Sequence, residues 1–143
     1  MTWSIDPSAE ALWACLTAPS HLSLWLGELV AGSVSAGQSF TIDHGEGYRC
    51  TSRVIAFEPT RLLKYSWSFP DEPVSEVSWS LSPEEDSTRL LLTHTGLENL
   101  VTSYLSGWMT HLTFLEAATL GSPLPISLFW RIHGTITHLN RSN

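Results

Sequence analysis

Basic residues are scarce in this chain of 143 residues. Seven lysines and arginines stand against 14 aspartates and glutamates, which gives a formal net charge of -7. Proteins that bind nucleic acid need clustered cations to contact phosphates, so this balance argues against nucleic acid as a partner. The acidic residues are scattered along the chain, as is typical of charges that keep a protein soluble.

Cysteine and long hydrophobic runs are also lacking. Cys15 falls in a predicted helix and Cys50 in a predicted strand, and neither has the spacing of a metal-ligand set. We expect two buried free thiols, as in a cytosolic protein. No segment reaches the ~20 apolar residues of a membrane span, and residues 1–3 lack the basic start of a signal peptide. The sequence therefore predicts a cytoplasmic protein without membrane association.

Motifs for metals, cofactors and nucleophilic catalysis are missing as well. The sequence has no HExxH pattern, no paired cysteines and no serine nucleophile elbow. Gly45-Glu46-Gly47 is interpreted as a hairpin turn rather than a phosphate loop. We therefore predict no metal and no cofactor, assign no catalytic residue, and favour a non-enzymatic role.

Tryptophan, in contrast, is abundant. Seven tryptophans in a chain long enough for one domain favour either a large aromatic core or an aromatic-lined site. In the segment 61–69, residues 63, 65, 67 and 69 share one face of a predicted strand, and 77–81 alternates even more strictly. These segments bring Trp67 and Trp79 to the inner face of one sheet.

Turn signals give the order of the remaining elements. Asp6-Pro7 and Ala18-Pro19 each begin a short helix, because proline is tolerated in the first helical turn. Gly27 ends the second helix, and turn residues then recur at hairpin spacing. The expected elements are a strand at 1–5, the two helices, a short strand within 28–37, strands at 40–42, 48–57, 61–69, 77–81 and 88–95, and a helix at 98–120.

Two of these elements carry detailed expectations about which side chains face inward. The strand at 48–57 is expected to hold Tyr48, Cys50, Val54 and Ala56 in phase. The long helix carries an apolar stripe at spacings of three and four. Its members are Val101, Tyr104, Leu105, Trp108, Leu112 and Leu115.

Residues 122–143 follow no such pattern. Pro123 and Pro125 break the helix, and an apolar patch that includes Phe129 and Trp130 follows. Three interpretations stay open for this segment: a second helix, a flap over a cavity, or a dimer contact.

Four segments of the chain form a recognisable series: Ser8-Ala9-Glu10-Ala11-Leu12-Trp13, Glu58-Pro59 with Leu63-Lys64-Tyr65-Ser66-Trp67, Ser87 to Leu97, and Gly107-Trp108-x-x-x-Leu112-x-x-Leu115. In this order they resemble the activator of heat-shock-protein-90 ATPase homologue-like (AHSA-like) branch of the START-like (SRPBCC) superfamily. The resemblance covers roughly residues 3–121. It implies an α+β helix-grip fold: a curved antiparallel sheet wrapped around a long C-terminal helix, with two short N-terminal helices. Residues 1–121 would form this domain, and 122–143 an extension outside the family pattern.

The resemblance also implies a cavity between sheet and long helix, although the superfamily includes carriers, cyclases, hydrolases and chaperone cofactors. We predict an apolar wall with three polar groups, His94, Tyr104 and His111, that orient a ligand. The complete predicted ligand-binding set is Trp25, Tyr48, Trp67, Trp79, His94, Tyr104, Trp108 and His111.

The predicted function is binding of a small apolar or aromatic ligand. One alternative is a cyclase- or hydrolase-like enzyme that uses the pocket histidines as acid and base. The other is a chaperone-associated interaction module, whose partner would contact an exposed apolar face such as that around Phe129 and Trp130. A homodimer formed through residues 122–143 is a further expectation.

Overall fold

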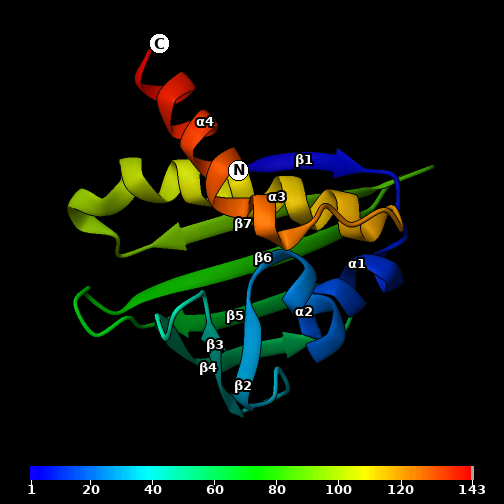
Figure 1. Ribbon diagram of the computed structural model, residues 1–143. Helices are drawn as coiled ribbons and strands as arrows, with labels where there is room; N and C mark the ends of the chain where they lie inside the picture. Colours follow the sequence, from blue (N-terminus) through cyan, green and yellow to red (C-terminus); the bar gives the residue numbers. More distant parts are fainter. Residues whose placement is uncertain (143) are drawn as a thin grey trace.

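The computed structural model describes residues 1–142, which form one curved sheet with helices against it (Figure 1). The strands are β1 (Thr2–Ile5), β2 (Glu28–Gly32), β3 (Ser39–Asp43), β4 (Arg49–Glu58), β5 (Leu62–Trp67), β6 (Ser75–Pro83) and β7 (Thr88–Thr95). The helices are α1 (Ala9–Thr17), α2 (Pro19–Trp25), α3 (Val101–Thr119) and α4 (Phe129–Arg141), with short 3-10 turns η1 (Glu98–Leu100) and η2 (Ile126–Leu128). The order of elements predicted from the sequence is confirmed.

The seven strands follow the order β1-β7-β6-β5-β4-β3-β2, and every neighbouring pair is antiparallel. β1 and β2 are therefore the two edges, and α1 and α2 carry the chain from one edge to the other (Figure 1). Both short helices contact α3. The result is the predicted α+β helix-grip arrangement, an open curved sheet with a long C-terminal helix.

The inner face of the central strands follows the predicted alternation. Leu63, Tyr65 and Trp67 of β5 are buried, and so are Val77 and Trp79 of β6. β6 pairs with β5 so that Trp79 lies opposite Leu63. The alternation in the sequence therefore predicted correctly that the indole rings of Trp67 and Trp79 face inward, because side chains two residues apart share a face of a strand.

β4 departs from the expected phase. Its pairing with β5 shifts between Val54 and Ala56, which marks a β-bulge. Beyond the bulge Ala56 lies opposite Lys64, and Phe57 turns to the face of Leu63. The expectation that Ala56 continues the inward phase is wrong, because the extra residue of a bulge reverses the alternation.

The apolar stripe of α3 is also narrower than predicted. Trp108, Leu112 and Leu115 are buried, but Val101 is 59% exposed and Leu105 is 43% exposed. The prediction is wrong at these last two positions, since the sheet covers only part of the helix. Elsewhere on α3 the buried Ser106 accepts a hydrogen bond of 2.9 Å from Nδ2 of Asn140 on α4.

Residues 122–142 form η2 and α4, so the first of the three interpretations, a second helix, describes this segment. Phe129 anchors it: its ring is buried and lies 4.7 Å from the ring of His111 and 5.2 Å from that of Phe114, between centroids. The dimer contact stays a prediction.

Two further sequence expectations concern thiols and membranes. Cys15 and Cys50 are both buried and free, as expected, and burial raises the pKa of Cys50 to about 12. Neither thiol is a reactive thiolate at neutral pH. Among residues 1–142, no helix combines the length and apolar character needed to cross a bilayer.

Candidate functional site

The space directly between the sheet and α3 is filled by aromatic rings. Trp79 contacts Trp25 and Trp108 edge-on, with ring centroids 5.6 and 5.5 Å apart, and Trp67 lies 5.3 Å from Trp108. Trp25 and Trp79 are 0% exposed. Each finds an internal acceptor for its indole N–H: Trp25 donates to the carbonyl of Cys15 at 2.7 Å, and Trp79 to the hydroxyl of Tyr65 at 2.9 Å.

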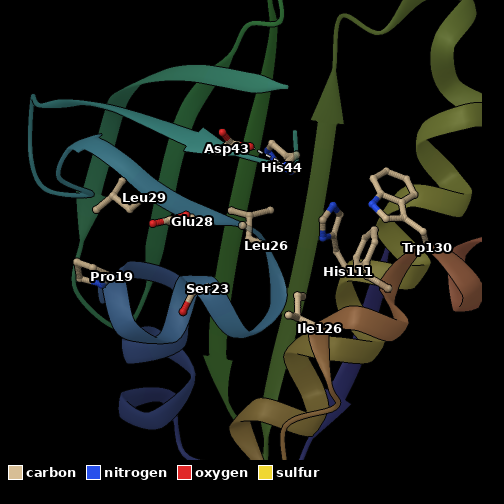
Figure 2. A pocket seen from close by; sticks show the side chains of 13 residues that line it. Pro19, Ser23, Leu26, Glu28, Leu29, Asp43, His44, His111, Ile126 and Trp130 are labelled. Carbon is tan, nitrogen blue, oxygen red and sulfur yellow. Dashed lines mark hydrogen bonds between the residues drawn. The ribbon is translucent and has the colours of Figure 1, made fainter. Parts of the chain in front are cut away.

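Two clefts open beside this packed centre. The larger cleft, about 580 Å³, runs between α2, the start of β2 and the end of β3 on one side and η2 and α4 on the other. The smaller cleft, about 170 Å³, lies between the end of β5 with the loop that follows it, the turn before β4 and the first half of α3. His44, His111 and Trp130 line both, so the two clefts adjoin. Figure 2 shows His111 and Trp130 across the larger cleft from His44.

Gly27 allows two elements that form the wall of the larger cleft, the end of α2 and the end of β3, to pack closely. A Cβ atom on Gly27 would lie 2.6 Å from the carbonyl oxygen of Asp43 and 2.6 Å from Cγ2 of Ile42. The chain leaving α2 can therefore lie against the end of β3 only because this residue has no side chain. This contact places α2 beside the histidine that follows Asp43.

His94 is held by a hydrogen-bond relay that uses both of its ring nitrogens. Trp108 donates its indole N–H to Nδ1 of His94 at 2.9 Å. Burial lowers the pKa of His94 to about 4, so the ring is neutral and carries its proton on Nε2. That proton points to the hydroxyl of Ser75 at 2.7 Å. His94 faces inward as predicted, but it does not line either cleft.

His111 presents a hydrogen-bond acceptor to both clefts. Its Nδ1 lies 2.8 Å from the carbonyl oxygen of Trp25, so it must carry the proton. Burial lowers the pKa of His111 to about 4, despite the opposing effect of that hydrogen bond. The neutral ring therefore has its lone pair on Nε2.

His44 is a site residue that the sequence interpretation missed. Its ring lies 5.8 Å from that of His111 and 5.6 Å from that of Trp67. Its buried Nε2 has no partner among the described residues. Burial, followed by the neighbouring His111, lowers the pKa of His44 to about 3. The signal was present in the alternation of Phe40 and Ile42, which continues inward to residue 44.

A second relay ends in a carboxylate. Trp67 donates its indole N–H to the hydroxyl of Tyr104 at 2.9 Å, and Tyr104 donates to Glu72 in a short hydrogen bond. Burial, and then the hydrogen bond to Glu72, raise the pKa of Tyr104 above its ordinary value. Glu72 lines the smaller cleft. Glu72 lies between the strands predicted at 61–69 and 77–81, in a segment where a carboxylate is expected to be solvated. For this reason it was not among the predicted site residues.

The predicted ligand-binding residues thus divide into two groups. Five of them line the smaller cleft: Tyr48, Trp67, Tyr104, Trp108 and His111. The other three, Trp25, Trp79 and His94, lie behind it in the packed centre. Besides His44 and Glu72, the aromatic lining residues Phe69 and Trp130 were not in the predicted set.

The lining of the two clefts combines aromatic rings with carboxylates and neutral histidines. Glu28 and Asp43 line the larger cleft and Glu72 the smaller one, and neither lining includes a lysine or arginine from the described part of the chain. Within residues 1–142, no three His, Cys, Asp or Glu side chains gather at a distance suited to one metal ion. The arrangement offers aromatic faces and hydrogen-bond acceptors.

Comparison with known proteins supports the predicted resemblance. The sequence profile described as "Activator of Hsp90 ATPase homolog 1-like protein" matches residues 6–119. No curated protein matches the chain. The crystal structure of CalU16 from Micromonospora echinospora is similar, with a TM-score of 0.79 and 27% identity over 99% of this chain and 84% of CalU16. This similarity extends through α4, beyond the end of the family profile.

Two further structures have the same fold. DynU16 is 25% identical, with a TM-score of 0.76 over 86% of this chain and 47% of DynU16. The Aha1 dimer from Colwellia psychrerythraea is 19% identical, with a TM-score of 0.72 over 83% of this chain and 92% of that protein. The profile spans most of the chain, and the sheet order and long helix agree with it. The chain therefore belongs to the family of activator of Hsp90 ATPase homolog 1-like proteins and has the START-like helix-grip fold.

Proposed function

We propose that this protein binds a small apolar or aromatic molecule in the two adjoining clefts. The observation that carries the proposal is the histidine pair at their junction. His44 has a buried ring nitrogen without a partner among residues 1–142, and His111, which lines both clefts, has an unprotonated second nitrogen. A buried polar atom without a partner costs about 1–3 kcal/mol. A ligand that supplies a hydrogen bond there recovers part of that cost.

The size and lining of the clefts support the same proposal. The larger cleft, about 580 Å³, is within the range of about 300–1,000 Å³ that small-molecule sites occupy. Aromatic side chains with a few polar groups are the usual lining of such sites. DynU16, one of the structures of the same fold, is described as a protein of the dynemicin biosynthetic locus. A biosynthetic setting supports a small molecule over a protein as the occupant.

The way His94 is held argues against a catalytic role for this histidine. Both of its ring nitrogens take part in hydrogen bonds within the protein, to Trp108 and Ser75. A general acid or base needs a nitrogen within reach of the substrate. His94, one of the three polar groups predicted to orient a ligand, therefore serves to fix the orientation of Trp108.

Native mass spectrometry of the freshly purified protein tests the proposal, with a second spectrum after denaturation. We expect a discrete additional mass of a few hundred daltons that disappears on unfolding. The same spectrum reports whether a homodimer forms. In parallel, the protein is titrated with the neutral aromatic fluorophore 1-aminoanthracene, which should be displaced by the extracted compound.

A bare protein mass together with no binding of the fluorophore would contradict the proposal. The chaperone-associated role predicted from the family would then gain weight. The exposed side chain of Trp130 would be its first candidate contact, because the ring of Phe129 is buried.

A further inference from the structure

The smaller cleft is walled by aromatic rings from several elements. Trp67 is the last residue of β5 and Phe69 lies in the loop that follows it, while Tyr104 and Trp108 come from α3 and Tyr48 from the turn before β4. The rings contact one another: Trp67 lies 5.9 Å from Phe69 and 6.3 Å from Tyr104, and Tyr48 stacks on Phe69 at 4.3 Å. At about 170 Å³ the cleft is close to the cavity of about 150 Å³ that accommodates benzene in an engineered protein.

The hydrogen-bond donors of four of these rings are already engaged. Trp67 donates to Tyr104, Trp108 donates to His94, and Tyr104 donates to Glu72. The hydroxyl of Tyr48 lies 3.5 Å from Oδ1 of Asp71. A ligand therefore meets the ring atoms rather than a free donor, and the faces of such rings carry the negative part of the ring quadrupole.

The charged groups around the smaller cleft have the same sign. Glu72 is the charged side chain among its lining residues, and Asp71 lies at the rim beside Tyr48. Burial, followed by the negative charges of Glu72 and Asp71, raises the pKa of Tyr48 to about 12. The whole chain carries a formal charge of -7, which attracts cations toward such a site.

We infer that the smaller cleft binds the ammonium group of an organic cation, with Glu72 as counter-ion and Trp67, Tyr104 and Trp108 as cation–π partners. Aromatic faces around a carboxylate form the kind of site that recognises alkylated ammonium groups. A protonated amine also supplies the N–H donor that the acceptor nitrogen of His111 lacks. This inference rests on the proposed function and narrows it: the ligand is a molecule with a basic amine or quaternary ammonium group, and anionic ligands are excluded.

Choline and 3,3-dimethylbutan-1-ol test the inference, because they have the same shape and differ only in the charge at one atom. Binding is read from the indole N–H signals of Trp67 and Trp108 in two-dimensional NMR spectra of the whole chain. We expect choline to bind about tenfold more tightly than the alcohol, within the range of cation–π and ion-pair effects. Equal or tighter binding of the alcohol overturns the inference.

The Glu72→Gln variant separates charge from shape. The amide still accepts the hydrogen bond of Tyr104 but has no negative charge, so we expect several-fold weaker choline binding and unchanged binding of the alcohol. Glu85→Gln is the matched control, since it removes the same charge from the exposed loop between β6 and β7. Choline affinity that is the same in both variants overturns the role of Glu72.

The outcomes also separate this inference from the proposed function. If neither compound shifts the two indole signals, or if the co-purified ligand is neutral or anionic, the cation site is overturned. The proposed function is judged independently, by the bound mass in native spectra and by the binding of 1-aminoanthracene.

Discussion

Three inward-facing histidines have different tasks although the same effect keeps each of them neutral. His94 is fixed between Trp108 and Ser75, and His111 is fixed by one nitrogen. His44 has a buried nitrogen that finds no partner in the described part of the chain. Burial lowers the pKa of all three, to about 3 for His44 and about 4 for the other two. An unfolded histidine titrates near its ordinary pKa of about 6.5.

The stability of the protein should therefore fall as the pH falls from about 6.5 toward about 4. In this window the unfolded state binds protons that the folded state excludes, so the free energy of unfolding decreases with falling pH. His44 and His111 each contribute a slope of up to about 1.4 kcal/mol per pH unit. Urea unfolding at pH 7.5, 6.0 and 5.0 measures this, and His111→Gln should flatten the dependence.

The two carboxyl groups with lowered pKa values do not contribute to the change in stability between pH 7.5 and 5.0. The pKa of Asp43 is lowered by the backbone N–H of Gly45 and by Arg49, and that of Glu84 by Ser4. Their stabilisation is present above the ordinary carboxyl pKa and is lost only below about pH 4.5. An unfolding midpoint that stays constant between pH 7.5 and 5.0 would contradict the neutral assignment of the histidines.

Trp108 and Trp79 make a matched pair for separating packing from binding. Both are buried indoles that donate a hydrogen bond within the protein, but only Trp108 lines a cleft. We expect Trp108→Phe and Trp79→Phe each to lower the free energy of unfolding by about 1–3 kcal/mol. Only Trp108→Phe should weaken binding of 1-aminoanthracene, measured by fluorescence titration. Equal loss of binding in both variants would place the ligand elsewhere.

At the scale of elements, α4 both supports α3 and borders the clefts. Phe129 and Trp130 are adjacent residues, yet Phe129 is 8% exposed and Trp130 is 63% exposed. Asn140 ties the far end of the helix to α3 through Ser106. Phe129 therefore packs against α3 and also lines the larger cleft, whereas Trp130 contributes an exposed ring to both clefts.

Phe129→Ala should act mainly on stability, and Trp130→Ala mainly on ligand binding. We expect Phe129→Ala to lower the free energy of unfolding by about 3 kcal/mol, because it leaves a void beside His111 and Phe114. Trp130→Ala should change stability by no more than about 0.5 kcal/mol and weaken ligand binding, since the exposed ring borders both clefts. Thermal unfolding and fluorophore titration of both variants provide the test. Unaltered binding by Trp130→Ala would remove Trp130 from the site.

Element order and most inward faces could be predicted because they depend on local pattern. Alternation located Trp67 and Trp79, and turn chemistry located the hairpins. The bulge after Val54 could not be predicted, because it depends on the pairing of two strands. The exposure of Val101 was missed for a related reason: its own periodicity says nothing about how far the sheet extends.

The candidate site was harder to predict than the fold. Glu72 lies in an irregular loop, and its role depends on the hydroxyl of Tyr104, which is distant in sequence. Aromatic residues that line a cleft and those that fill a core have the same pattern in a strand. Trp67 borders the smaller cleft, whereas Trp79 is covered by other side chains in the packed centre. This difference depends on tertiary packing and not on the local sequence pattern.

At the scale of the whole molecule, the sheet is open and has two short edges. β1 has four residues and β2 has five, and the pairing of β2 with β3 is interrupted between Leu29 and Ala31. Short, irregular edges resist pairing with other chains. Association through the sheet edges is therefore disfavoured, and the predicted homodimer through residues 122–143 is left as the candidate contact.

Hydrogen exchange should rank the elements by their position in this sheet. We expect the slowest exchange in β5 and β6, whose backbone groups are paired on both sides, and faster exchange in β2 and α4. Binding of a ligand should slow amide exchange in the turn at residues 43–48 and at the start of α4. Mass spectrometry of peptides after exchange measures both effects, and protection confined to the β1 edge would contradict the placement of the site.

The pairing of β1 with β7 has a consequence for synthesis of the chain. Thr2 pairs with Leu91, so the first strand leaves the ribosome long before its partner is made. At about 5–20 residues per second, several seconds pass before β7 can join it. The hairpins from β2 to β6 can form during this interval, but the sheet cannot be completed. We therefore expect β1, although it is made before the other six strands, to join the sheet only after β7 is available.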